Sequence, residues 1–151
     1  MCFFRPRRLV TAPVSTQHAS PIVASGSHVL VVDDDPRICT AYVEILSAHG
    51  YEVTVAGNRA ETLAQLDRVG QSIEVLIVDL TLPDAEGAEL AHAIGERIGP
   101  RPALFVTGWA DEFWDLSAAP GRWLVMQKPI PVRRLIEGIE WLAGRRTRPP
   151  G

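Results

Sequence analysis

Five short apolar runs, each followed by polar residues and then a stretch with helical periodicity, constrain the fold of this chain most strongly. The runs are HVLVV at 28–32, YEVTVA at 51–56, IEVLIVDL at 73–80, ALFVT at 103–107 and RWLVMQ at 122–127. Strands that alternate with helices form parallel sheets, because each helix returns the chain to the edge where the next strand begins. We therefore expect an α/β fold, a doubly wound five-stranded parallel sheet with five flanking helices.

Local capping signals indicate where some helices begin. Asp35 is a suitable N-cap and Pro36 fits the first helical position. Asn58 with Glu61 three residues later resembles a capping box in its Asn variant. The segment DEFWDLSAAPG at 111–121 is poor helix sequence, so we expect the fourth helix to be short or irregular.

Length and composition indicate one domain. A chain of 151 residues suffices for one packed core and is short for two. We expect a flexible leader at 1–27, a domain at 28–143 and a basic tail at 144–151, with an over-called start codon left open. Cys2 and Cys39 supply no disulfide framework, which suits a reducing compartment. No apolar run reaches membrane-span or signal-peptide length, so we expect a cytoplasmic protein without membrane insertion.

Charge is unevenly distributed along the chain. Six of the 15 basic residues lie in the two tails, and nine remain against 18 acidic residues in the body. An acidic body argues against nucleic-acid binding. The basic tails are expected to keep disordered ends solvated, with contact to an acidic partner as the alternative.

Polar residues stand at the carboxyl ends of four of the five expected strands, where ligands bind in doubly wound sheets. They are Asp33 and Asp34 after the first strand, Asp79 on the third, Thr107 on the fourth and Lys128 after the fifth. Grouped carboxylate oxygens suit Mg²⁺, and an ammonium with a hydroxyl suits the oxygens of a phosphoryl group. Lys128 is also the one lysine of the chain, where a compact point charge serves better than a planar guanidinium.

The motifs VLVVDDDP, LIVDLTLPDAEG, FVTGWA and MQKPI together resemble the receiver domain of two-component response regulators, of the chemotaxis-regulator type, over residues 28–143. The resemblance implies a flavodoxin-like fold and a single-domain response regulator that uses Mg²⁺. It would take a phosphoryl group from a phosphohistidine on a sensor histidine kinase or phosphotransfer protein. It would catalyse only its own phosphorylation and dephosphorylation, and would signal or relay through contact with a downstream protein, with dimerisation left open.

The resemblance also implies roles for individual residues. Asp79 matches the phosphorylated aspartate, and Asp33, Asp34 and the Thr81 backbone carbonyl match its partners in holding the metal. The positions implied to stabilise or flank the phosphoryl group are Thr107, Lys128, Trp109, Val125 and Pro129, the last often following a cis peptide bond.

One position departs from the family pattern. Val125 stands where the family usually carries the Tyr or Phe of its aromatic switch, and Trp123 lies on the same side of the strand by alternation. Trp109, two residues after Thr107, is expected to shield the acyl phosphate from water.

Two other functions remain open on the sequence alone. A receiver-fold binding module that has lost phospho-switching would fit the Val125 departure. A metal-dependent phosphatase with Asp79 as nucleophile would fit the acids, although Thr81 stands where such enzymes usually carry a second acid. A nucleotide-binding protein is disfavoured because no Gly-rich loop follows the first strand.

Overall fold

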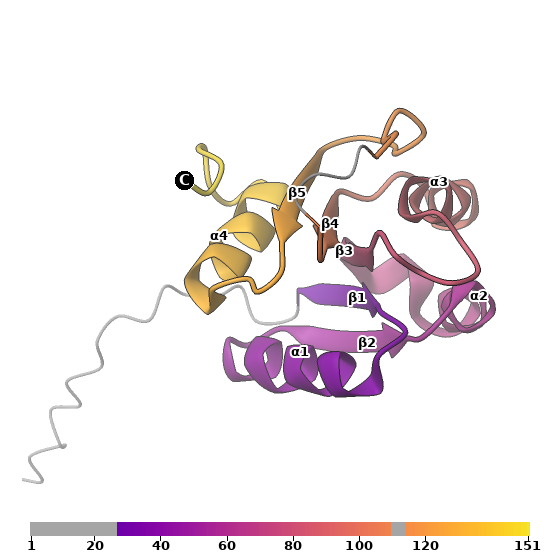
Figure 1. Cartoon of the computed structure of the whole chain (residues 1–151), viewed down its shortest axis with the longest axis horizontal. Helices are drawn as coiled ribbons and strands as arrows, with labels where there is room; N and C mark the ends of the chain where they lie inside the picture. The colour runs from indigo at the N-terminus through magenta and orange to yellow at the C-terminus, as the bar shows by residue number, and fades with distance from the viewer. Residues whose placement is uncertain (1–26, 110–113) are drawn as a thin grey trace, which may run out of the picture.

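A computed structural model describes residues 27–109 and 114–151. Its five strands form one parallel sheet in the order β2-β1-β3-β4-β5 (Figure 1), which confirms the expected doubly wound architecture. The strands are β1 (His28–Val32), β2 (Glu52–Ala56), β3 (Ile73–Asp79), β4 (Ala103–Thr107) and β5 (Trp123–Gln127). The helices are α1 (Pro36–Ala48), α2 (Arg59–Val69), α3 (Gly87–Ile98) and α4 (Val132–Leu142), with a short 3-10 turn η1 (Gly70–Ser72).

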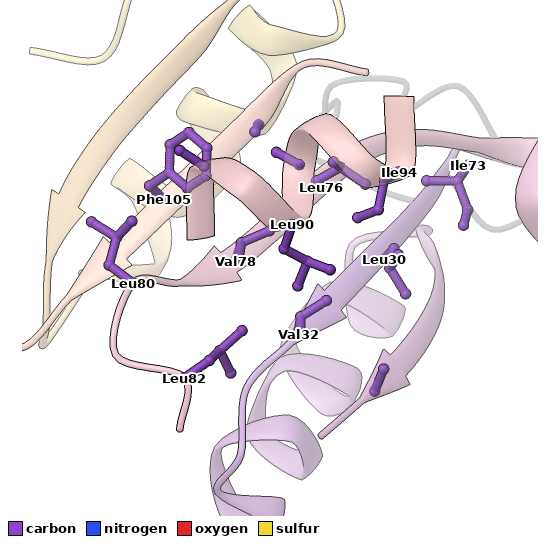
Figure 2. Packing of buried hydrophobic residues seen from close by; sticks show 14 of the residues in the cluster. Leu30, Val32, Ile73, Leu76, Val78, Leu80, Leu82, Leu90, Ile94 and Phe105 are labelled. Atoms are coloured by element: carbon purple, nitrogen blue, oxygen red, sulfur yellow. The ribbon is translucent and has the colours of Figure 1, made fainter. Parts of the chain in front are cut away.

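Helices cover both faces of the sheet. Residues of α2 and α3 pack with one face around Leu76 and Val78, and residues of α1 and α4 pack with the other around Val75 and Ile77. Figure 2 shows the α3 side, where Phe105 and other side chains from neighbouring strands meet. The central strand β3 is therefore buried on both sides, as its nearly continuous apolar sequence predicted.

The described residues contain four α-helices where five were expected. The missing element falls between β4 and β5. Residues 110–113, with part of the expected helix, lie outside the described residues, and residues 114–122 contain turns but no helix. Trp114 and Leu116 instead pack onto the α3 side of the core, and the burial of their apolar surface stabilises the segment without a helix. The poor helix sequence of this segment agrees with that outcome.

Both capping signals are borne out. Asp35 accepts a hydrogen bond from the Arg37 backbone N–H at 2.9 Å, and Pro36 opens α1. Asn58 accepts from the Glu61 N–H at 2.8 Å. The Glu61 carboxylate reaches the Gly57 N–H at 2.6 Å, one residue before the position that a standard capping box uses.

The basic tail contacts the domain itself, which differs from the expectation of solvated or partner-bound ends. The Arg145 guanidinium donates to Ser27 and, at 3.1 Å, to Glu74. Arg146 pairs with Glu137 at 3.2 Å, and so ties the tail to α4. The leader at 1–26 lies outside the described residues. Among the residues that are described, no helix combines the length and apolar character needed to cross a membrane.

A buried histidine joins three elements at the amino edge of the sheet. His28 begins β1 and is 1% exposed. Its Nδ1 lies 2.6 Å from the Ser72 hydroxyl oxygen, and its Nε2 lies 2.7 Å from that of Thr54. Because the Ser72 hydroxyl donates to the Val69 carbonyl, its oxygen accepts from Nδ1–H, and the Thr54 hydroxyl then donates to Nε2. His28 thus has a structural role.

We predict that His28→Leu lowers the free energy of unfolding by about 1–3 kcal/mol, since Leu removes both hydrogen bonds that the buried imidazole makes to Thr54 and Ser72. Urea unfolding monitored by circular dichroism measures the loss. The control is His92→Leu, an exposed position on α3, for which a change below about 0.5 kcal/mol is expected. Equal losses in the two variants would contradict the structural role of His28.

Candidate functional site

Sheet order brings the acidic residues together at the carboxyl edge. Strands β1 and β3 are neighbours, and Val32 pairs with Val78, so Asp33 and Asp79 follow side by side. Carboxylate oxygens of Asp33, Asp34 and Asp79 all lie within 4.8 Å of one another. Asp33 and Asp79 are 2% and 3% exposed, whereas Asp34 is exposed. The convergence that the sequence predicted for these three acids is confirmed.

Lys128 joins the two buried carboxylates. Its Nζ donates to Asp33 Oδ2 at 3.0 Å and to Asp79 Oδ2 at 2.8 Å. Its backbone N–H donates to the Thr107 carbonyl at 2.8 Å, which holds the residue just past the end of β5. The peptide bond to Pro129 is cis, as the resemblance implied. Backbone contacts therefore position Lys128 at the end of the edge strand β5, and its side chain reaches past β4 to both acids.

The second oxygen of Asp79 is held by the loop that follows β3. The backbone N–H and the hydroxyl of Thr81 each donate to Asp79 Oδ1 at 2.7 Å. With Lys128 on Oδ2, both carboxylate oxygens have donors and the side chain has a fixed orientation. A nucleophile that is held in one orientation loses little entropy on reaction.

The two buried acids differ in their ionisation. Burial raises the pKa of Asp33 and outweighs the hydrogen bonds from the Asp35 N–H and Lys128. Burial also acts to raise the pKa of Asp79, but the hydrogen bonds from Lys128 and from the two Thr81 donors outweigh burial and lower this pKa below its usual range. Burial opposes the charge of Lys128, yet the two carboxylates together raise the pKa of its ammonium. Asp79 is thus an anion and Lys128 a cation at neutral pH.

Thr107 lies at the same edge, but its hydroxyl is engaged with its own loop. Its Oγ1 accepts from the Trp109 N–H and donates to the Trp109 carbonyl, both at 3.1 Å. Thr107 is buried, whereas Trp109 is 66% exposed. The structure brings Thr107 into the neighbourhood of the acids without joining it to them in the hydrogen-bond network.

The face of β5 on the α2–α3 side has little cover from the described residues. Trp123 and Val125 both point to this side, as alternation predicted, and each is 42% exposed. Met126 points to the opposite side and is buried among residues of α1 and α4. The shortage of helix between β4 and β5 therefore coincides with two exposed apolar side chains on β5.

A cavity of about 680 Å³, which no sequence pattern predicted, opens next to Lys128. Residues of α1 and of the loop between β5 and α4 line it, among them Ile38, Tyr42 and Ile130. Burial raises the pKa of Tyr42 to about 12, so its hydroxyl stays protonated. Ile38, Tyr42 and Ile45 lie on one face of α1, and part of that face borders the cavity.

The donor set of the acidic cluster suits a hard divalent cation. All three side chains offer carboxylate oxygens. The nitrogens that contact these oxygens are backbone N–H groups and the Lys128 ammonium, which donate hydrogen bonds and cannot act as metal ligands while protonated. Two buried anions that share one cation keep an excess of negative charge. Oxygen ligands with room for water on the exposed Asp34 side fit Mg²⁺.

Comparison with known proteins agrees with this geometry. A family model described as the response regulator receiver domain matches residues 29–140. The response regulator receiver protein CpdR of Brucella abortus is 30% identical over 113 residues, which cover 74% of this chain and 92% of the relative. The crystal structure of a CheY-like receiver domain protein from Methanospirillum hungatei matches with a TM-score of 0.67 at 30% identity, over 78% of this chain and 94% of that one.

Some relatives are longer than this chain. The transcriptional regulatory protein TrcR of Mycobacterium tuberculosis is 30% identical over 143 residues, which cover 93% of this chain and 54% of TrcR. The match to the sensor protein TorS of Escherichia coli, at 28% identity, covers 12% of that protein. The match to residues 29–140, the fold and the order of the motifs show that this chain belongs to the response regulator receiver domain family.

Proposed function

We propose that this protein is a single-domain response regulator that accepts a phosphoryl group on Asp79 from a phosphohistidine of a sensor kinase or phosphotransfer protein. The observation that carries the proposal is the buried Asp79 carboxylate, ionised and oriented by Lys128 at 2.8 Å inside a cluster of three acids. A structural acid at a strand end needs neither a paired ammonium nor two further carboxylates beside it.

The transfer is a displacement at phosphorus. An Asp79 oxygen forms a bond to phosphorus while the bond from phosphorus to the donor imidazole nitrogen breaks, and the imidazole keeps the electron pair. Bound Mg²⁺ would supply two positive charges against the phosphoryl oxygens, held by Asp33, Asp34, Asp79 and the backbone carbonyl of Thr81. Lys128 adds a third positive charge and can move from the carboxylate to a phosphoryl oxygen without changing its backbone position.

The apolar cavity beside Lys128 suits the docking of the phosphohistidine-bearing partner. Ile38 and Ile130 lie on its two walls, and Lys128 lines it where it meets the acidic cluster. A partner that fills this cavity excludes water and brings its imidazole near Asp79. Docking here would involve α1 and the loop before α4, away from the exposed face of β5.

Output in this proposal begins at Thr107. Its hydroxyl donates to the Trp109 carbonyl, so donation to a phosphoryl oxygen requires that it leave Trp109. The loop that carries the exposed indole then changes its anchoring. Trp109, Trp123 and Val125 would present the apolar surface that a downstream protein contacts.

One observation favours the alternative of a receiver-fold binding module. Val125 is aliphatic and exposed, so the described structure supplies no aromatic side chain at that position to follow the movement of Thr107. A protein of this kind would keep the partner surfaces and lack the phosphorylation-dependent change. The first experiment below separates the two functions.

We predict that the full chain, incubated with acetyl phosphate and Mg²⁺, gains one labile phosphoryl adduct by intact mass spectrometry, because Asp79 is ionised and oriented for attack. Asp79→Asn is expected to gain none. The control is Asp115→Asn, an exposed acid outside the cluster, which should behave as wild type. Absence of an adduct in every protein, with no calorimetric response to Mg²⁺, would favour the binding module.

We predict that Trp109→Ala speeds loss of the phosphoryl group several-fold, since Trp109 lies two residues after Thr107 and its indole is expected to reduce access of water to the acyl phosphate. The rate is measured from the decay of the adduct after removal of acetyl phosphate. Trp123→Ala serves as the matched control, because this indole is also exposed but lies at the far end of β5. An unchanged decay in Trp109→Ala would remove the shielding role.

We predict that Lys128→Met lowers the free energy of unfolding by about 1–3 kcal/mol near neutral pH, because two buried carboxylates lose their shared cation. In wild type the lowered pKa of Asp79 stabilises the fold above the ordinary carboxyl pKa, and this contribution fades as the pH falls through the folded-state value. In the variant no cation offsets the burial of the two carboxyl groups, so burial favours their protonated form. The free energy of unfolding of the variant therefore falls as the pH rises.

The difference between the two proteins should therefore be larger near neutral pH than at about pH 4, where carboxyl groups of ordinary pKa titrate. Urea unfolding at the two pH values measures it without added metal. Arg97→Met, which removes the exposed pair between Arg97 on α3 and Asp67 on α2, is the control with little expected effect at either pH. A difference that does not vary with pH would contradict the assignment of charge.

A further inference from the structure

The loop between β3 and α3 is fixed at three points. Thr81 donates twice to Asp79, and Leu82 is buried in the core on the α3 side, where Figure 2 labels it beside Val32. Further along the loop, the Asp84 carboxylate accepts a hydrogen bond from the backbone N–H of Arg59 at 3.1 Å. Arg59 is the first residue of α2 and stands 25 positions earlier in the chain.

The start of α2 also contacts the loop after β1, which carries the other acids. The Asp33 backbone N–H donates to the Ala56 carbonyl at 3.1 Å, at the point where β2 leads into α2. A Cβ built on Gly57 would lie 3.8 Å from the Asp33 carbonyl oxygen, so the two loops are in van der Waals contact. The short segment from Ala56 to Arg59 therefore touches both loops of the acidic cluster.

We infer that Asp84 is a positioning residue, and that its bond to the Arg59 N–H makes the start of α2 a brace between the loops that hold the metal. This inference rests on the proposed function, because it assigns the Thr81 carbonyl to the cation. The brace connects Asp33 at one end, through Ala56 and Arg59, to Asp84 and so to Thr81 at the other. Neither Asp84 nor α2 takes a direct part in the proposed phosphoryl transfer.

The physical reason is the geometry that Mg²⁺ requires. This ion accepts little deviation from octahedral coordination, so a carbonyl on a loop binds well only if the loop is already in place. Thr81 and Leu82 fix the first part of the loop, and the Asp84 bond fixes the part that approaches α3. The Asp84 carboxylate lies at the N-terminus of α2, where an anion also interacts favourably with the helix dipole. This interaction stabilises the bond to Arg59 although the bond lies on the exposed surface.

Four variants separate this bond from charge and from side-chain packing. Asp84→Ala removes the acceptor, and Asp84→Asn removes the charge but keeps an acceptor oxygen. Arg59→Pro removes the donor N–H at the first helical position, where Pro is well accepted, and the extended backbone of Asn58 (φ −161°, ψ 177°) tolerates a following Pro. Arg59→Ala removes the same side chain and keeps the N–H.

Titration calorimetry with Mg²⁺ alone, on the full unphosphorylated chain, measures the affinity of each variant. We expect Asp84→Ala and Arg59→Pro each to weaken binding by about three- to tenfold, and the double variant to bind no more weakly than either. Asp84→Asn and Arg59→Ala should bind as wild type does. Rescue by Asn distinguishes positioning from the loss of a nearby negative charge.

Two results would overturn the inference while leaving the proposed function intact: wild-type affinity in Asp84→Ala, or equal weakening by Asp84→Asn and Asp84→Ala, which would indicate charge alone. Additive losses in the double variant would likewise show that Asp84 and Arg59 act separately. Failure of wild type itself to bind Mg²⁺ is a different outcome, since it would contradict the proposed function together with the brace.

Discussion

The contact of one ammonium with two buried carboxylates is the interaction on which the rest of the site depends. Lys128 reaches Asp33 and Asp79 from the end of β5, across the full width of β4. Two anions at this depth repel each other strongly, and a single cation offsets only part of that repulsion. The remaining negative charge is what a divalent cation and a phosphoryl group together can neutralise. The site thus stores unfavourable electrostatic energy that ligand binding releases.

The sheet makes that contact possible because it is rigid and its edge is open. Helices pack on both faces through two separate apolar clusters, so the strands cannot tilt to separate the acids. The polar groups of the site lie at the carboxyl ends of the strands and in the loops that follow them. A rigid frame with polar loops at one edge suits chemistry that depends on positioning more than on acid–base catalysis, as phosphoryl transfer does.

The loops of the site are held by hydrogen bonds that differ in what they allow. The Thr81 donors orient Asp79, and the Asp84 bond joins the same loop to α2. Among the described residues, the hydroxyl of Thr107 bonds to the backbone of Trp109 within its own loop, an arrangement that a new acceptor can replace at little cost. Next to that loop, the sheet face at Trp123 and Val125 is exposed. The part of the edge able to move therefore adjoins the part able to bind a protein.

The sequence by itself determined the order of strands and helices, two helix caps and the gathering of strand-end acids at one edge of the sheet, because alternation, capping chemistry and strand-end acids are local signals. It also located the segment after β4 as a weak helix. Only the tertiary structure decided that Arg145 and Arg146 bind the domain's own glutamates, that the Thr107 hydroxyl turns toward Trp109, and that Asp84 meets Arg59. These contacts depend on where loops far apart in sequence come to lie, and a periodic pattern carries no information about that. Strand order places Asp33 beside Asp79, but the packing of whole elements sets which side chains then touch.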